Sequence, residues 1–515
     1  MKHYVMNIVR SLIVVGLACG MSLGWNIPAR SNFSVAFMSP GIGEPAIGAV
    51  TADGTVDVTV EVESATETLQ KDGKPVKVTS GVYDLRLFRD GQLVGSSIPK
   101  PAIERYIAAA PAAVARDIAA NKVLQTEEDA LWRTANDLLK VTSPELKIVS
   151  PTKAVYTFHN IQLPRDGRKE VEFSAYAFNT DRVKSDTARS KYPLPQLPAA
   201  ASKKAYIVSV GVNTSDLVDW HLRFAAKDAE VTQKALADRL RDQYEVVPIL
   251  LISDAGDGAG APRKNAIKAN IRTTLELLSG VAQQPADVAR LSAAIGESML
   301  KKLARSTPQD IVIITFSSHG FADPSGNFYL LPSDLRISRT EPNIPERDSM
   351  ISSDELSLWM RDLDASDAVM IVDACYAASS VTGTGFKPAP MGSRGLGQLA
   401  YDKQMRILTA TREKDAAVEI GGDVKEGLLT YALVKEGLGD NMADFKPKPD
   451  GKLYLSEWLE FAQNEVPVIF DKLAKGELKG SKGVPFGSAA TTTYLQRPAL
   501  FDFRRKKDND IQLVH

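Results

Sequence analysis

From about residue 205 onward, continuous apolar runs alternate with segments whose apolar positions repeat with the period of a helix. Apolar runs bounded by polar residues predict strands buried on both faces, and strands that alternate with helices favour a mostly parallel sheet. The predicted strands are AYIVSVGV, YEVVPILLIS, DIVIITFSS, DAVMIVDA and MRILTATR, and helices are expected at FAAKDAEVTQKALADRL, within 263–305, at EGLLTYALVKEGL and within 452–475. The pattern therefore predicts an α/β fold for this half of the chain.

A different pattern fills residues 51–192. TVDVTVEVES alternates apolar and polar residues, and GVYDLRLFRDGQLVG predicts a hairpin that turns at RDGQ. Further strands are expected at KAVYTFHNIQL and at KEVEFSAYAFNTDRVKSDTA, and the latter stretch resembles the last strands of immunoglobulin-like domains. The alanine-rich segment 101–143 predicts helices. We therefore expect a β-sandwich, immunoglobulin-like accessory domain that carries a helical insertion.

The N-terminus has the layout of an export signal. Lys2 and Arg10 precede SLIVVGLACGMSLGW, an apolar stretch of about fifteen residues, which is short for a membrane-spanning helix. We expect an exported protein, periplasmic or secreted, or a membrane-anchored one where the signal stays uncleaved. A lipid anchor on Cys19 is a third alternative, although Gly16 stands three positions before the cysteine, where a large aliphatic residue is usual.

Stretches rich in Pro, Gly, Ser or Ala mark the expected boundaries. The predicted organisation is a signal peptide or anchor at 1–26, a linker at 27–50, the accessory domain at 51–192, a second linker at 193–204, the α/β domain at 205–500 and a charged tail at 501–515. An apolar content of 44% and a charged content of 24% are typical of globular domains. A net charge of -1 gives no indication of a nucleic-acid partner.

The chain holds 2 cysteines, and Cys19 falls in the predicted signal. The mature exported chain would then carry Cys375 as its one thiol, without a partner for an intramolecular disulfide. A single thiol in an oxidising compartment indicates a reactive cysteine. The alternative is a small buried apolar residue, because free cysteine is among the most buried residue types.

A histidine takes a corresponding place on another predicted strand. His319 follows IVIITFSS as Cys375 follows VMIVDA, and the other histidines, namely His3, His159, His221 and His515, lie elsewhere. In open α/β sheets, sites form at the carboxyl ends of the strands. If these two strands are neighbours, an imidazole faces a thiol, as a cysteine nucleophile requires. The backbone N–H of Gly320, with that of Cys375, would suit an oxyanion hole.

The motifs SSHGF and VDACYA, whose His and Cys lie at 319 and 375, resemble those of the caspase and metacaspase family of cysteine peptidases. YIVSVGVN, LRFAAKDAE and GLLTYAL support the resemblance, which covers about 205–440. It implies a caspase-like α/β/α sandwich with Cys375 as nucleophile, His319 as acid/base and Gly320 in the oxyanion hole. Ser318 and Tyr376 depart from the family pattern and leave the specificity open.

The resemblance to metacaspases also implies a substrate class. Asp228 in AAKDAE and Asp373 in VDAC match the positions whose carboxylates bind a basic side chain before the scissile bond. The family therefore predicts cleavage after Arg or Lys, through charge-assisted hydrogen bonds. For Asp228 a solvated helix face beside Lys227 and Glu230 is the alternative.

The segment 381–403 is rich in Gly and Pro and is expected to be an exposed loop. Lys387, Arg394 and Lys403 would be sites of self-cleavage for an enzyme with basic specificity; a merely flexible loop is the alternative. We expect no metal or other cofactor, with calcium dependence open, and a protein or peptide as substrate. The rival function is a secreted binding or scaffold protein on a catalytically silent caspase fold.

Overall fold

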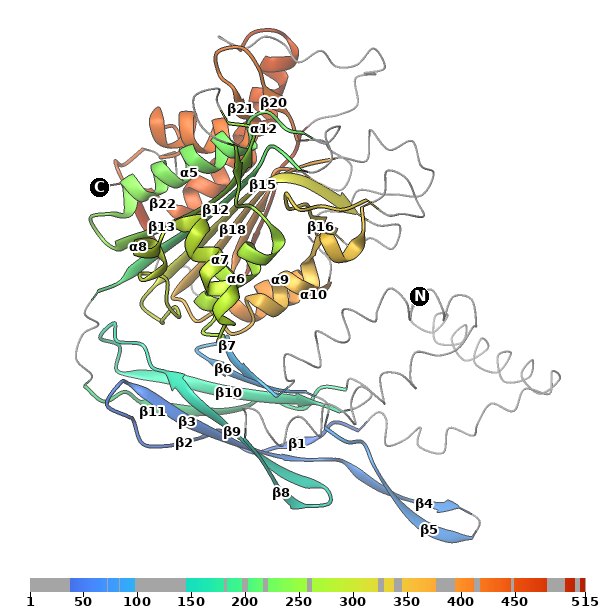
Figure 1. The fold of residues 1–515 in the computed structure, drawn as a ribbon. Coiled ribbons are helices and arrows are strands. Elements are labelled where there is room, and N and C mark those ends of the chain that lie inside the picture. Colours follow the sequence, from blue (N-terminus) through green and yellow to red (C-terminus); the bar gives the residue numbers. More distant parts are fainter. Residues whose placement is uncertain are drawn as a thin grey trace, which may run out of the picture.

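The computed structural model describes residues 38–71, 73–82, 84–97, 145–179, 183–196, 202–215, 221–256, 262–322, 328–337, 345–376, 394–411, 417–445, 449–478, 496–504 and 510–514. They form two bodies (Figure 1), the accessory domain (38–196, blue to teal) and the α/β domain (202–514, green to red). The predicted signal and the predicted helical insertion at 101–143 lie outside the described residues. Within the described ranges, no helix is both long and apolar enough to cross a membrane.

The accessory domain consists of two antiparallel sheets and a separate ribbon. The first sheet contains β1 (Gly41–Ile42), β2 (Ala46–Ile47), β3 (Thr55–Glu63), β8 (Glu145–Ser150) and β9 (Lys153–Gln162); the second contains β6 (Asp84–Arg89), β7 (Gln92–Ser96), β10 (Glu170–Phe178) and β11 (Ala188–Pro193); the ribbon is β4 (Thr66–Lys71) with β5 (Lys74–Thr79). Both sheets contribute to one core: Val58 and Val60 from β3 pack with Leu85 of β6 and Phe173 of β10. The period of two along β3 predicts this burial.

Two features of the accessory domain test the sequence expectations directly. The hairpin predicted at RDGQ is confirmed: β6 and β7 are joined at Asp90 and Gly91, whose φ angles of 48° and 81° are left-handed, as tight hairpin turns require. The linker predicted at 27–50 is wrong in its second half. There β1 and β2 both pair with β3, because their backbone groups continue its ladder.

The α/β domain is built on one large sheet. Its strands follow the spatial order β14-β13-β12-β15-β18-β19-β23, with β16 and β17 attached beside β15. Their bounds are β12 (Lys204–Val212), β13 (Glu245–Asp254), β14 (Arg263–Lys264), β15 (Ile311–Ala322), β16 (Phe328–Leu330), β17 (Ile351–Ser352), β18 (Asp367–Tyr376), β19 (Arg406–Thr409) and β23 (Ala499–Asp502). The five predicted strands are the inner ones, and their four mutual pairings are all parallel. The predicted mixed α/β class is thus confirmed.

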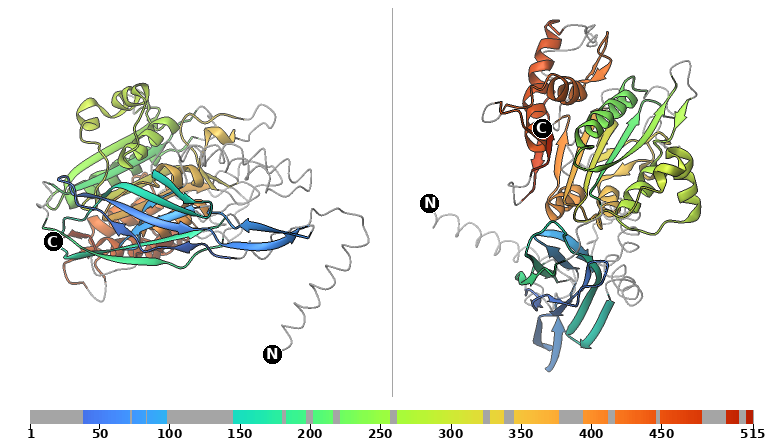
Figure 2. Two further views of the ribbon diagram at one scale, coloured as in Figure 1. Left: turned by 90° about the horizontal axis from the view of Figure 1, so that it is seen from below. Right: turned by 90° about the vertical axis from the view of Figure 1, so that its left-hand side faces the viewer.

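Helices cover both faces of this sheet (Figures 1 and 2). The helices of one face are α6 (Lys268–Leu278), α7 (Pro285–Ile295), α8 (Glu297–Leu300), α9 (Ser353–Trp359) and α10 (Arg394–Lys403); those of the other are α5 (Ala225–Leu240), α11 (Leu428–Thr430), the π-helix η4 (Tyr431–Gly439) and α12 (Leu455–Ala474). Successive β12 residues alternate between the two cores: Tyr206 and Val208 face the first, Ala205 and Ile207 the second. The continuous apolar run of β12 reflects this double burial.

The charged tail predicted at 501–515 is wrong for the described residues of that range, 501–504 and 510–514. The strand β23 closes the edge of the main sheet, and β24 (Gln512–Val514) pairs with β22 (Leu453–Tyr454). Between them, Arg504 and Asp510 join a buried ion-pair network with Arg406. The charges of Arg504 and Asp510 therefore stabilise the fold. A short 3₁₀ turn, η2 (Arg347–Ser349), and the hairpin β20 (Glu419–Ile420) and β21 (Glu426–Gly427) complete the described elements.

The accessory domain contacts the α/β domain at the amino ends of the main-sheet strands. Arg89 on β6 donates to the Asp364 carboxylate at 2.7 Å, and both side chains are buried. Gln92 donates to the Ala365 carbonyl at 2.9 Å, close before β18. Lys403, the last residue of α10, donates to the carbonyl oxygen of Leu93 at 2.6 Å. This contact is thus made of charged and polar groups paired across the two domains.

Candidate active site

His319 and Cys375 lie at the carboxyl ends of two neighbouring strands of the main sheet. Because β15 and β18 are adjacent parallel strands, their register places His319 beside Cys375 and Gly320 beside Tyr376. Paired strands lie about 4.8 Å apart, and this spacing separates the backbones of His319 and Cys375. The side chain of His319 is partly exposed, whereas that of Cys375 lies outside the described residues. The expected juxtaposition of the two strands is found, and the catalytic roles stay predictions.

Gly320 lies at the same edge, in tight surroundings. A Cβ at this position would come within 2.9 Å of the Phe328 ring and 3.2 Å of the Ala374 Cβ. The strand β16 therefore approaches β15 closely just past the histidine, where a side chain would push them apart. Ser318, in place of the family's glycine, is fully buried and donates to the His319 carbonyl at 2.9 Å. The departure from the family pattern is thus accommodated inside the strand.

The two predicted carboxylates of the substrate pocket converge although their residues are far apart in sequence. Asp228, on the first turn of α5, is 4% exposed, so the alternative of a solvated helix face is wrong. Its carboxylate accepts from the backbone N–H of Gly427 at 2.9 and 3.1 Å. A Cβ on Gly427 would lie 2.9 Å from Asp228 Oδ2 and 2.7 Å from Asp373 Oδ2. Both carboxylates therefore lie against the same glycine.

The electrostatics of this pair are unusual for aspartates. Burial raises the pKa of Asp373 to about 7, and the negative charge of Glu419 acts in the same direction. Burial and the charge of Asp373 raise the pKa of Asp228 well above its ordinary range, against the lowering effect of the Gly427 N–H. Asp373 Oδ2 is buried without a hydrogen-bond partner in the described structure. Close carboxylates of this kind retain a proton unless a cation is bound between them.

Glu419 and Gly427 are functional candidates that sequence reasoning missed. Glu419, on β20, accepts from the N–H groups of Arg223 and Phe224 at 3.0 and 2.8 Å, just before α5 begins. Gly427 ends β21 and lacks a side chain where the two carboxylates meet. Glu419 lies in no motif quoted above, whereas Gly427 is the first residue of GLLTYAL but was not singled out there as a site residue. The hairpin of β20 and β21 thereby adds a third acidic side chain near the pair.

The described residues leave little space directly behind the acidic pair. A cavity of about 10 Å³ is lined by both aspartates together with Thr315, Ile371 and Leu433. That volume corresponds to roughly one water molecule. Lys227, the nearest residue in sequence with a positive charge, pairs instead with Glu426 at 3.0 Å. The two carboxylates thus have no cationic partner among the described side chains.

The predicted self-cleavage sites lie in different settings. Lys387 is outside the described residues, and Arg394 begins α10. Lys403 ends that helix and is 2% exposed, with its Nζ bonded to the carbonyls of Leu93 and Leu363 at 2.6 and 2.7 Å. The expectation of an exposed loop up to residue 403 is therefore wrong for its last ten positions, and a peptidase could not reach Lys403 in this arrangement. The apolar face of α10 packs on the sheet, which is why it is not a loop.

No group of three or more His, Cys, Asp or Glu side chains in the described part of the chain is arranged to hold a metal ion. The expectation of no cofactor, with calcium dependence open, stays a prediction.

Comparisons with known proteins add no family. No family model matches the chain, and no curated protein matches it. Among solved structures, the multi-modular chitinase ChiW of Paenibacillus sp. str. FPU-7 is 10% identical over 65% of this chain, with a TM-score of 0.14, and vertebrate astrotactin-2 is 8% identical over 52%, with a TM-score of 0.12. The matches span 20% and 36% of those two chains. At these TM-scores the likenesses carry no argument about fold or activity.

Proposed function

We propose that the protein is a cysteine endopeptidase of the caspase and metacaspase type, exported from the cell, that cleaves after Arg or Lys. The observation that carries this proposal is the register of β15 and β18, which sets His319 directly beside Cys375 at the carboxyl edge of the main sheet. The caspase-like α/β/α fold and the immunoglobulin-like character of the accessory domain are part of the same proposal. Helices on both faces of a largely parallel sheet are consistent with it.

The chemistry follows from a thiol next to an imidazole. His319 takes the proton of Cys375, and the thiolate sulfur bonds to the scissile carbonyl carbon. The imidazolium then donates this proton to the departing amine as the C–N bond breaks, which leaves a thioester. Water next loses a proton to His319, attacks the thioester and releases the acid, so that thiolate and imidazolium are restored. The N–H groups of Gly320 and Cys375 are proposed to stabilise the oxyanion.

The basic specificity is proposed from the acidic pair. Asp228 and Asp373 converge beside Gly427 with no cationic partner among the described side chains. A guanidinium or ammonium group of the substrate would displace the retained proton and form charge-assisted hydrogen bonds. Asp373 is two residues from Cys375 on the same strand, so a bound side chain would lie close to the reacting carbonyl. An acidic side chain would be repelled from the same place.

A set of fluorogenic peptides with Arg, Lys, Asp or Ala before the scissile bond tests the proposal. The mature protein is expected to cleave the Arg and Lys peptides, with and without calcium in separate arms, and Cys375→Ala and His319→Ala are expected to abolish cleavage. Cleavage after Asp would retain the nucleophile and discard the basic pocket. No cleavage of any peptide, together with a Cys375 that resists a thiol-reactive probe, would instead favour a binding or scaffold protein.

A further inference from the structure

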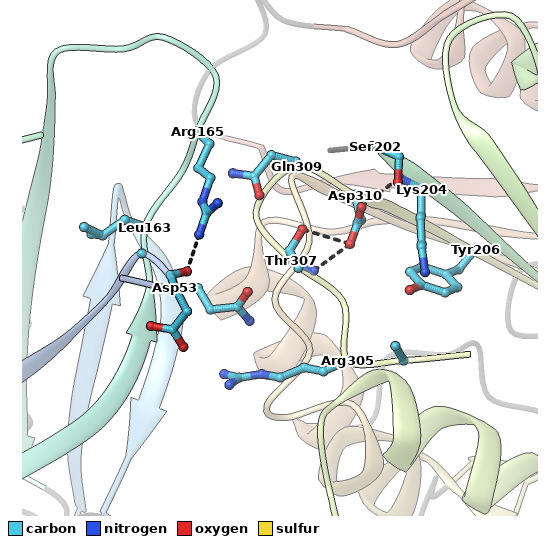
Figure 3. A pocket seen from close by; sticks show the side chains of 13 residues that line it. Asp53, Leu163, Arg165, Ser202, Lys204, Tyr206, Arg305, Thr307, Gln309 and Asp310 are labelled. Atoms are coloured by element: carbon cyan, nitrogen blue, oxygen red, sulfur yellow. Dashed lines mark hydrogen bonds between the residues drawn. The ribbon is translucent and has the colours of Figure 1, made fainter. Parts of the chain in front are cut away.

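A cavity of about 340 Å³ lies between the accessory domain and the α/β domain (Figure 3). Its lining residues come from both domains: Asp53 and Arg165 from the accessory side, Lys204, Arg305 and Gln309 from the other. Lys204 begins β12, and residues 304–310 lead into β15, so the cavity lies at the amino ends of the strands, opposite His319. Its volume is that of a site for a small molecule, and such sites favour domain interfaces.

The walls of this cavity are held in place by contacts across the interface. Gln162, at the end of β9, donates to the Ser306 carbonyl at 3.1 Å. The buried Arg89–Asp364 pair fixes the accessory sheet to the segment before β18. The stem of Arg305 packs on Gly280, where a Cβ would come within 2.6 Å of the Arg305 Cδ. A ligand would therefore meet a largely pre-formed site.

The two carboxylates that line the cavity already accept hydrogen bonds. The Asp310 carboxylate already accepts from the N–H of Lys204 at 2.8 Å and from the N–H and hydroxyl of Thr307 at 2.8 and 2.9 Å. Asp53, at the rim, accepts from the hydroxyls of Thr51 and Thr55, and its backbone carbonyl accepts from Arg165. Both negative side chains thus have partners of their own.

The side chains of Gln309 and Arg305 offer hydrogen-bond donors to the cavity. Gln309 is 8% exposed, and its Nε2 has no hydrogen-bond partner in the described structure. Figure 3 shows its amide end and the guanidinium of Arg305 both directed toward the accessory domain, where Arg165 lies. A buried amide without a partner is costly unless a ligand or water accepts its hydrogen bond. Two guanidinium groups beside it favour a ligand that carries negative charge.

We propose that this interdomain cavity binds a small oxyanion, a phosphate or a polycarboxylate, through Arg305, Gln309 and Arg165. Its oxygens would accept from the Gln309 amide and the Arg305 guanidinium on one wall and from Arg165 on the other. A bound anion would thereby connect the two domains at the edge of the sheet opposite the candidate active site. The proposal does not depend on peptidase activity, because binding is measured without turnover.

Calorimetric titration of the Cys375→Ala full chain tests this site. Inorganic phosphate and citrate are the two probes, each compared with sodium chloride at equal ionic strength. We expect saturable binding of one anion per chain and an increase in Tm, because a ligand that binds only the folded state stabilises it. Stronger binding of phosphate or of citrate would identify which of the two anion types the site prefers.

Two variants and a control decide whether the cavity is the place of binding. Arg305→Gln, at an exposed position, and Gln309→Glu, which adds a like charge, are each expected to weaken binding roughly tenfold to a hundredfold, as loss of a hydrogen bond to a charged group does. Lys234→Gln, which removes an exposed cation from α5, is the matched control and should change nothing. Binding no stronger than that of chloride, or equal binding by Arg305→Gln, would overturn the proposal.

Discussion

The two ends of the main sheet hold buried aspartates in opposite electrostatic settings. At the amino ends of the strands, Asp364 pairs with Arg89 and Asp367 pairs with Arg406. At the carboxyl end, Asp228 and Asp373 are buried against one another, without a cation among the described side chains. All four side chains are largely removed from water, so each ionised form is costly unless it is paired.

The two ends differ in whether the neighbouring charges neutralise the buried aspartate. Burial raises the pKa of Asp367, but the charges of Arg406 and Arg504 oppose that effect, and the group is fixed within the fold. For Asp373, negative neighbours act in the same direction as burial, so its pKa reaches about 7. A protein gains no stability from such a pair, and strongly perturbed groups at a sheet edge are typical of functional sites. The pairs at the amino end therefore hold the fold and the two domains together, whereas the pair at the carboxyl end fits the proposed binding of a basic side chain.

Removing a cation from the amino end is expected to give the largest effect on stability. Arg406→Met leaves Asp367 buried without the arginine that it pairs with and leaves Asp510 paired with Arg504 alone, and breaking a buried ion pair costs about 3–5 kcal/mol. Urea unfolding followed by circular dichroism measures the loss.

The matched control is Arg336→Met, which removes an exposed arginine that also contacts two carboxylates, Glu346 and Asp348. There we expect a change of about 0–1 kcal/mol, because exposed ion pairs contribute little. Equal losses in the two variants would contradict the difference between buried pairs and surface pairs.

Removing a charge from the carboxyl end should affect catalysis instead. On the proposed function, Asp373→Asn lowers kcat/KM for Arg peptides. The loss of transition-state stabilisation should be about 1.5–3 kcal/mol, the range for hydrogen bonds to charged groups. The free energy of unfolding should equal or exceed that of the unmodified protein, because the variant removes one of two carboxylates that repel each other. Steady-state kinetics and unfolding of the same preparation measure both.

Asp354→Asn, on α9, is the control for this variant, because it removes the carboxylate of an exposed aspartate that lies outside the acidic pair. Its kcat/KM should match that of the unmodified protein. An Asp373→Asn protein that loses stability as Arg406→Met does would show that the pair is structural.

Per unit of pH, the pH dependence of stability gives the smallest of the three effects. The pKa of Asp373 is about 7 in the folded protein and near 3.8 when unfolded, so the folded state binds more protons between these values. This contribution is fully present below about pH 4 and is lost as the pH rises through 7, at up to about 1.4 kcal/mol per pH unit for one proton. Urea unfolding between pH 4 and 8 should show a shallower decline for Asp373→Asn. Identical slopes would contradict the raised pKa.

Sequence reasoning worked best where one segment decides its own structure. The alternation in TVDVTVEVES and the RDGQ turn each contain the physical cause of their conformation, and both are found as expected. It failed where distant segments meet. The buried Lys403 has acceptors for its Nζ in the backbone of β7 and at Leu363, and β23 and β24 form because β19 and β22 offer free ladders. None of these partners is recognisable from the neighbouring sequence.

The candidate site likewise has features that the local sequence predicts and features that depend on contacts between remote segments. By itself the sequence determined the buried strands, their alternation with helices, and the positions of His319 and Cys375 after two of them. Only the tertiary structure decided that these strands are adjacent and in matching register, and that Gly427 donates to Asp228 across 199 residues. The reason is physical: hydrophobic period is encoded locally, whereas register and the convergence of charges depend on packing between segments that are remote in the chain.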